Sequence, residues 1–88
     1  MINNKKIAEL KIVARAAQER ADVSGTFRAI GLKNTARALR EVANDETTSL
    51  QKVANLVREA GKTASGRADT AGRYEGLVLA QKIIARRG

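Results

Sequence analysis

Apolar residues recur at spacings of three and four positions along most of this chain, which is the period of one face of an α-helix. The first stripe predicts a helix over residues 4–20, and its members are Ile7, Leu10, Ala14, Ala17 and Ala21. The second predicts a helix over residues 25–44, and its members are Phe27, Leu32, Thr35, Ala36, Leu39, Val42 and Ala43. Since the 88 residues include no Pro, we expect helix nearly everywhere outside the segments that contain Gly.

The second half of the chain predicts a short helix, a loop and a long helix. Thr48 with Gln51 three positions later matches a capping box and would begin the short helix, which Gly61 would end in the left-handed conformation. Residues 62–69 are polar without an apolar period and are expected to form a loop. In the last helix, over residues 70–86, apolar side chains cover most of the circumference, which is typical of a central helix or of one that contacts another subunit.

These elements predict one all-α domain over residues 1–88, a small four-helix domain. Residues 6–32 and 52–79 also resemble each other weakly, because Arg-Ala-Asp at 20–22 and at 67–69 precedes a Gly, an aromatic residue and further apolar positions. A genuine duplication would make the domain two pseudo-symmetric helical hairpins. Chance similarity in a chain rich in Ala and Arg is the competing explanation.

Composition and charge exclude several function classes. The chain has 17 Lys and Arg against 9 Asp and Glu, a formal net charge of +8, and neither Cys nor His. A disulfide framework, a zinc finger and an imidazole base are therefore excluded. No nucleophile in the sequence has an evident partner base, so we expect a non-catalytic protein without cofactor or bound metal.

The apolar runs are too short for membrane or export signals. Residues 1–6 lack the apolar stretch of a signal peptide, and the longest apolar run, residues 77–80, is far shorter than a membrane span. We therefore expect no membrane partner and a cytoplasmic location, with which the absence of Cys agrees.

The basic residues of the second predicted helix lie opposite its apolar face. Lys33, Arg37 and Arg40 follow one another at spacings of four and three and would form one stripe, where they could neutralise phosphates and release counterions. We therefore predict largely sequence-independent binding of duplex nucleic acid, with DNA favoured. An ordinary solvated helix face would show the same pattern. A second basic group in and after the predicted loop would contribute to binding and consists of Lys62, Arg67 and Arg73.

The chain has two aromatic residues, Phe27 and Tyr74, each at the start of a predicted helix and followed by apolar positions. This placement favours a core position for both rings. Proteins that bind single-stranded nucleic acid usually stack bases on exposed aromatic rings. A duplex, which is contacted through its backbone, is therefore the preferred ligand.

Two nucleotide- and DNA-binding motifs match only in part. Gly61-Lys62-Thr63 is similar to the end of a phosphate-binding loop, but Leu56 occupies the position of the first Gly that this motif requires. A helix-turn-helix that begins at Thr48 would need a turn of three or four residues, whereas the polar segment after Gly61 is longer. Neither motif is expected to function here.

Residues 27–41 carry a short family resemblance. Phe27-Arg28-Ala29 followed by Ala36-Arg37-Ala38-Leu39-Arg40-Glu41 resembles part of the helical N-terminal domain of X-family DNA polymerases, a helix-hairpin-helix module. The glycine-rich hairpin that this family has downstream is missing. The resemblance therefore implies neither the lyase chemistry of that family nor its binding loop.

The apolar last helix also suggests a protein partner. Leu79 and Ile83 would form an interface, and we expect a homo-oligomer. An acidic protein surface is the alternative partner of the basic residues, in which case the chain would be an inhibitor or adaptor of a nucleic-acid-processing enzyme, encoded by a virus or mobile element. A third interpretation is a structural helical assembly unit whose charge keeps it soluble.

Overall fold

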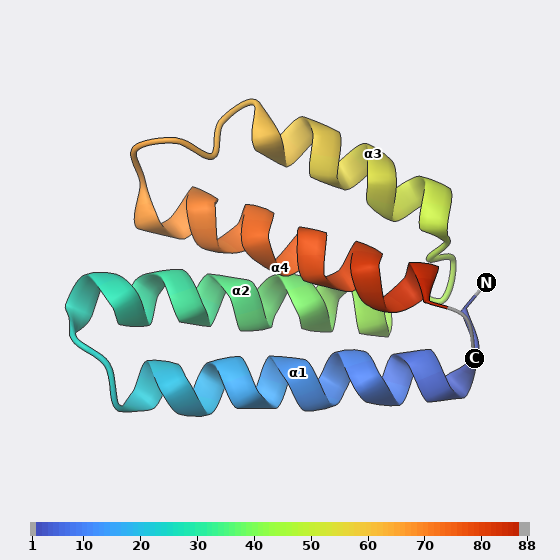
Figure 1. Cartoon of the computed structure of the whole chain (residues 1–88), viewed down its shortest axis with the longest axis horizontal. Coiled ribbons are helices and arrows are strands. Elements are labelled where there is room, and N and C mark those ends of the chain that lie inside the picture. The colour runs from blue at the N-terminus through green and yellow to red at the C-terminus, as the bar shows by residue number, and fades with distance from the viewer. Residues whose placement is uncertain (1, 87–88) are drawn as a thin grey trace.

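The computed structural model describes residues 2–86 and contains, within that range, four α-helices and no strand. They are α1 (Asn4–Asp22), α2 (Thr26–Asn44), α3 (Leu50–Gly61) and α4 (Ala68–Ala85). Figure 1 shows two antiparallel hairpins, α1 with α2 and α3 with α4, and the parallel helices α2 and α4 pack side by side between the other two. The predicted all-α four-helix domain is confirmed.

The core is built from small side chains. The largest fully buried residues are Leu10, Leu39, Leu77 and Val53, and alanines fill much of the space between them. Ala14, Ala36 and Ala80, one from each of α1, α2 and α4, are 0% exposed. Because alanine adds little volume, these helices approach one another closely, and the position of each helix is set by backbone contact as much as by large side chains.

Lys6 fastens the end of α4 to the beginning of α1. Its side chain is only 7% exposed, and its ammonium group donates hydrogen bonds to the carbonyl oxygens of Ile83, at 2.8 Å, and of Arg86. The last carbonyls of a helix have few partners within the helix. Lys6 supplies a donor to the Arg86 carbonyl and a second donor to the Ile83 carbonyl, which also accepts from the amide of Arg86 at 3.4 Å. The Arg86 guanidinium also donates to Glu9 at 2.7 Å.

The start and end of α3 differ from the predicted ones. Ser49, rather than Thr48, is the N-cap, and its hydroxyl accepts a hydrogen bond from the amide of Lys52 at 3.2 Å. The Thr48 hydroxyl is buried and donates to the carbonyl of Val42 at 3.1 Å, so it is not available for capping. Gly61 lies in the last turn of α3 and does not have the positive φ predicted for it. Among the described residues, only Gly66 has a positive φ, of 88°.

The two aromatic residues have different environments. Tyr74 is half-buried and packs against the core, as predicted. Phe27 is 80% exposed, so its predicted core position is wrong. The close contact of α2 with α4 begins at Gly31, one turn after Phe27. The first turn of α2 therefore extends beyond the neighbouring helix, which would otherwise cover the ring of Phe27.

The apolar circumference of α4 reflects its central position, because this helix packs against α1, α2 and α3. Ile83 is 2% exposed and belongs to the core, which corrects its assignment to a partner interface. Leu79 is half-buried and packs on the edge of the core, and its interface role stays a prediction, as does the internal repeat. Within residues 2–86, no helix is long and apolar enough to cross a membrane.

Candidate nucleic-acid interface

The outer face of α2 carries the basic stripe. Lys33, Arg37 and Arg40 are exposed, on the side of the helix opposite the buried residues Thr35 and Val42. Since α2 packs on α1 and α4 through its other side, these three side chains project into solvent along about two turns of helix. The packing of α2 against its neighbours therefore determines which of its residues a ligand can reach.

α1 adds two cations beside this stripe. Lys11 and Arg15 of α1 line a hollow of about 340 Å³ together with Arg40 and Asn44 of α2. Lys11 and Arg15 are not among the predicted site residues, although the sequence contains a signal for them. A hairpin that turns near Gly25 places residues equally distant from the turn side by side, which brings Lys11 opposite Arg40.

The five residues Lys11, Arg15, Lys33, Arg37 and Arg40 are called the α1–α2 basic surface below. Among the described residues, Arg15 alone of the five has a carboxylate partner, Glu19 at 3.7 Å, and both of these side chains are largely exposed. An exposed pair of this kind contributes little to stability and separates readily. The surface therefore keeps its positive charge available for a ligand.

The second predicted basic group is divided by the fold. Arg73 of α4 forms an ion pair of 3.6 Å with Glu41 of α2 and lies beside the α1–α2 basic surface. Lys62 pairs with Glu59 at 3.2 Å just after α3, and α4 lies between α3 and α2 (Figure 1). Of the two, the structure brings only Arg73 close to the stripe on α2.

Arg67 lies at the start of α4. Its guanidinium group holds Asp69 through two hydrogen bonds, of 3.0 and 3.2 Å. The pKa of Asp69 is lowered, first because its carboxylate accepts a hydrogen bond from the amide of Thr70 and then because of Arg67. Arg67 is thus partly neutralised and belongs to the end of the molecule where α2 and α4 begin.

The carboxylate of Asp45, directly after α2, accepts hydrogen bonds from nearby residues. The ammonium of Lys52 donates to its carboxylate, as do the hydroxyl and the amide of Thr47 at 2.7 and 2.9 Å. These bonds, that of Lys52 foremost, hold the pKa of Asp45 well below its usual range. The carboxylate is therefore committed to the α2–α3 connection and does not neutralise the basic surface.

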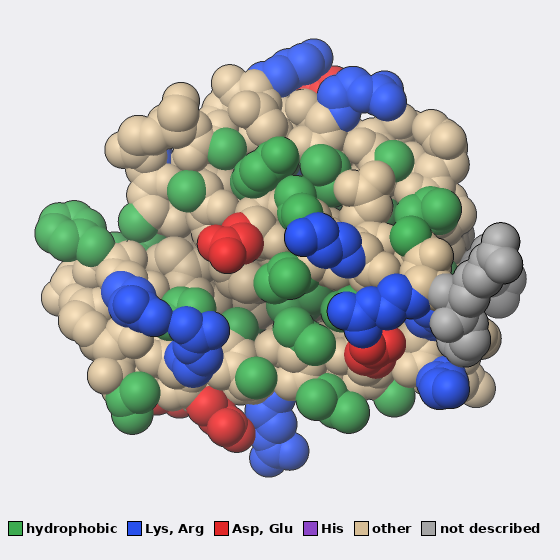
Figure 2. All heavy atoms as spheres, viewed as in Figure 1, with side chains coloured by type: hydrophobic (Ala, Val, Ile, Leu, Met, Phe, Trp, Pro, Cys, Tyr) green, Lys and Arg blue, Asp and Glu red, His purple; other side chains and the backbone are tan. Residues whose placement is uncertain are grey.

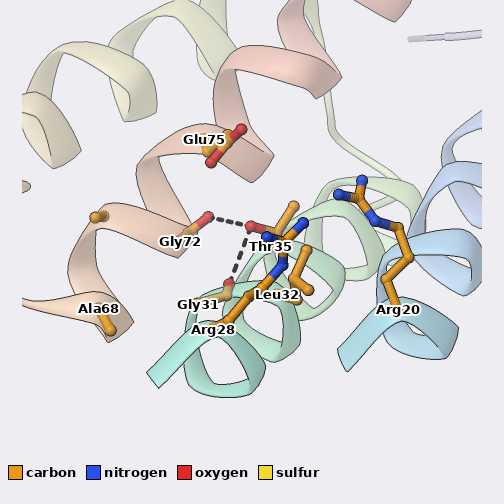
Figure 3. Close-up of a pocket in the computed structure, with 9 residues that line it drawn as sticks. Arg20, Arg28, Gly31, Leu32, Thr35, Ala68, Gly72 and Glu75 are labelled. Atoms are coloured by element: carbon orange, nitrogen blue, oxygen red, sulfur yellow. Dashed lines mark hydrogen bonds between the residues drawn. The ribbon is translucent and has the colours of Figure 1, made fainter. Parts of the chain in front are cut away.

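A second hollow, of about 350 Å³, lies between α1, α2 and α4. In Figure 3, Arg20 extends toward it from α1, Arg28 from α2 and Glu75 from α4, and the Thr35 hydroxyl below them contacts the carbonyl oxygens of Gly31 and Gly72. On the face shown in Figure 2, basic side chains are dispersed among acidic and apolar ones. The hollow itself also combines two cations, Arg20 and Arg28, with the acidic side chain of Glu75.

Comparisons with protein-family models, curated proteins and solved structures give no match. The short resemblance to X-family DNA polymerases thus receives no support from them. In the structure, the two antiparallel helices α1 and α2 present five neighbouring cations. Such an arrangement can donate hydrogen bonds to phosphate oxygens and displace counterions from a nucleic acid.

Proposed function

We propose that this protein binds duplex nucleic acid, with DNA as the favoured form, through the α1–α2 basic surface and without catalysing a reaction. The observation that carries the proposal is the juxtaposition of Lys11 and Arg15 of α1 with Arg40 of α2, next to Lys33 and Arg37. Four of these five residues have no ion pair among the described residues. Their charge is balanced only by solvent ions until a polyanion binds.

The dimensions of the surface fit a few successive phosphates. From Lys33 to Arg40 the helix rises about 10 Å, at 1.5 Å per residue. One DNA strand carries a phosphate about every 3.4 Å of duplex length, so this stripe can meet about three phosphates of one strand. Lys11 and Arg15 widen the surface and extend the contact to about four or five phosphates.

The proposal is tested by the salt dependence of binding to a labelled duplex of random sequence. Each neutralised phosphate contributes a slope of about −0.9 to the plot of log affinity against log salt, so contact with about four or five phosphates gives a slope of about −4. The same affinity is expected for unrelated sequences, because phosphate contacts carry no sequence information. No binding at about 50 mM salt would overturn the proposal.

An acidic protein surface is the second candidate ligand, and the exposed ring of Phe27 favours it. Protein interfaces are centred on aromatic anchors, and Arg is enriched there as well. In this case the chain would act as an inhibitor or adaptor of a nucleic-acid-processing enzyme. The same titration distinguishes the two, since a protein-specific surface would show no affinity for a random duplex.

A further inference from the structure

The hollow of about 340 Å³ between α1 and α2 gathers three cations in one place. Lys11 and Arg15 border it from α1 and Arg40 from α2, and Asn44 of α2 completes the lining. All four side chains are exposed, so a ligand can enter the hollow from solvent. Ammonium, guanidinium and amide groups supply N–H donors that point at one ligand. The hollow therefore fits a small anion of high charge that has several acceptor oxygens.

Two other hollows on the surface contain a carboxylate. Glu75 belongs to the lining of one, and Asp69 belongs to the lining of the other. A carboxylate in the lining repels an anion and competes with it for the cations. Among the described residues, the lining of the α1–α2 hollow includes no carboxylate. Glu19, which pairs with Arg15 at 3.7 Å, is largely exposed, and such a pair separates readily when a stronger anion arrives.

The basic stripe of α2 ends at this hollow. Arg40 is the last cation of the helix, and Asn44 is its last residue. Asp45 and Glu46 follow directly, and Glu46 is exposed without an ion pair among the described residues. A row of phosphates along the stripe would meet negative charge if it continued past Asn44. This position therefore favours the end of a nucleic-acid strand over its middle.

The phosphates within a strand and at its end differ in charge and in access. A phosphate within a strand carries a single negative charge, and the chain continues from it on both sides. A terminal phosphate carries about −1.5 to −2 at pH 7 and has three strong acceptor oxygens. It is linked to the strand through one oxygen only, so it can enter a hollow end-on and be surrounded by donors.

We propose that the α1–α2 hollow binds the terminal phosphate of a duplex whose adjacent phosphates lie along the basic stripe of α2. This inference rests on the proposed function and deepens it, because it places one end of the duplex. Lys11, Arg15 and Arg40 donate hydrogen bonds to the phosphate oxygens, and the amide of Asn44 is a further donor. The protein consequently prefers duplex ends that carry a phosphate to ends that carry a hydroxyl group.

The test compares short duplexes of one sequence that differ only at their ends. One duplex has hydroxyl groups at every end, a second carries 5′-phosphates and a third carries 3′-phosphates, so the two sources of a terminal phosphate are distinguished. At constant salt, the wild type should bind at least one phosphorylated duplex about tenfold more tightly than the unmodified duplex, the effect of one additional charge-assisted contact.

Two variants that each lose one cation locate this preference. Lys11→Ala removes a donor from the hollow and should abolish most of the preference. Lys33→Ala removes a cation from the other end of the stripe and should weaken binding of all three duplexes by the same factor. Both side chains are exposed on helices, and Ala favours helix, so both variants should fold normally. An undiminished preference in Lys11→Ala would overturn the assignment to this hollow.

The side-chain amide of Asn44 reports the contact directly. Its NMR signals should shift further with a phosphorylated duplex than with the unmodified one. Asn34 provides the control, because its amide already donates to the carbonyl oxygen of Ile30 at 2.8 Å, and its signals should not distinguish the duplexes. Equal shifts of the Asn44 signals with all three duplexes would contradict the end-on contact.

The outcomes separate the two proposals. Salt-dependent binding of the wild type with no preference for either phosphorylated end would overturn the terminal-phosphate site and leave the proposed function standing. No affinity for any of the three duplexes at about 50 mM salt would overturn both.

Discussion

A Cβ atom added to Gly72 would lie 2.1 Å from the carbonyl oxygen of Gly31. The backbones of α4 and α2 therefore touch at this crossing, and a further contact follows one turn later, where a Cβ on Gly76 would lie 2.5 Å from the carbonyl oxygen of Thr35. This contact fixes the rotation of α2 about its axis. It consequently determines that Lys33 and Arg37 face solvent.

The Gly31–Gly72 contact is asymmetric, which gives a sharp mutational prediction. Gly72→Ala should destabilise the fold by about 3 kcal/mol or more, because backbone atoms must move apart. Gly31→Ala, on the facing helix, should be neutral or stabilising by up to about 1 kcal/mol, because its Cβ would meet only the Ala68 carbonyl oxygen, at 3.6 Å, and Ala favours helix. Urea unfolding of both variants measures the difference. Equal destabilisation would contradict this packing of α2 on α4.

Lys6 should contribute strongly to stability although it is charged. Lys6→Met keeps the aliphatic stem but removes the hydrogen bonds to the carbonyls of Ile83 and Arg86, and we expect a loss of about 1.5–3 kcal/mol. The neighbouring Lys5 is exposed, and Lys5→Met should change stability by less than about 0.5 kcal/mol. Thermal or urea unfolding measures both. A Lys6→Met variant as stable as Lys5→Met would show that α4 does not need this anchor.

Asp45 should make stability depend on pH. Its pKa in the folded protein is lowered from the ordinary 3.8, so the ionised carboxylate contributes stability that is fully present above this ordinary value. This contribution to stability declines as the pH falls below 3.8 toward the lower pKa of Asp45 in the folded protein. Asp45→Asn should therefore be less stable than the wild type at pH 7, and the difference should narrow on acidification.

Glu46 supplies the control for this prediction, because it is exposed and has no ion pair among the described residues. Glu46→Gln should leave the stability at pH 7 nearly unchanged. Urea unfolding from pH 7 to pH 3 measures the profiles. If the stability difference between Asp45→Asn and the wild type were constant over this range, the link between Lys52 and Asp45 would not contribute to stability.

The local sequence was sufficient to predict the helices but not the capping residue of every helix. The spacing of Leu10, Ala14 and Ala17 fits one face of a helix, and the predicted helix is present as α1. Thr48 and Ser49 are adjacent hydroxyl residues, either of which can begin a helix. Which of the two residues caps α3 depends on a contact outside the local pattern. The Thr48 hydroxyl donates a hydrogen bond to the Val42 carbonyl, and Ser49 is therefore the residue that caps α3.

The surface residues required knowledge of how the helices pair. Periodicity places Lys33 and Arg40 opposite the apolar face of α2 without any tertiary information, and both are exposed. The contribution of Lys11 depends on the register of the α1–α2 hairpin. The exposure of Phe27 depends on where α4 crosses α2, a position that Gly72 sets and that no pattern within α2 encodes.

The most direct test of the central claim compares two triple variants that lose the same charge. Lys33→Ala/Arg37→Ala/Arg40→Ala removes three cations from the α1–α2 basic surface, and Arg58→Ala/Lys62→Ala/Lys82→Ala removes three exposed cations from the α3–α4 hairpin. With a random duplex between about 50 and 200 mM salt, the first variant should flatten the wild-type slope of about −4 by about 3, whereas the second should leave it nearly unchanged. Equal changes in slope would contradict the assignment of binding to this surface.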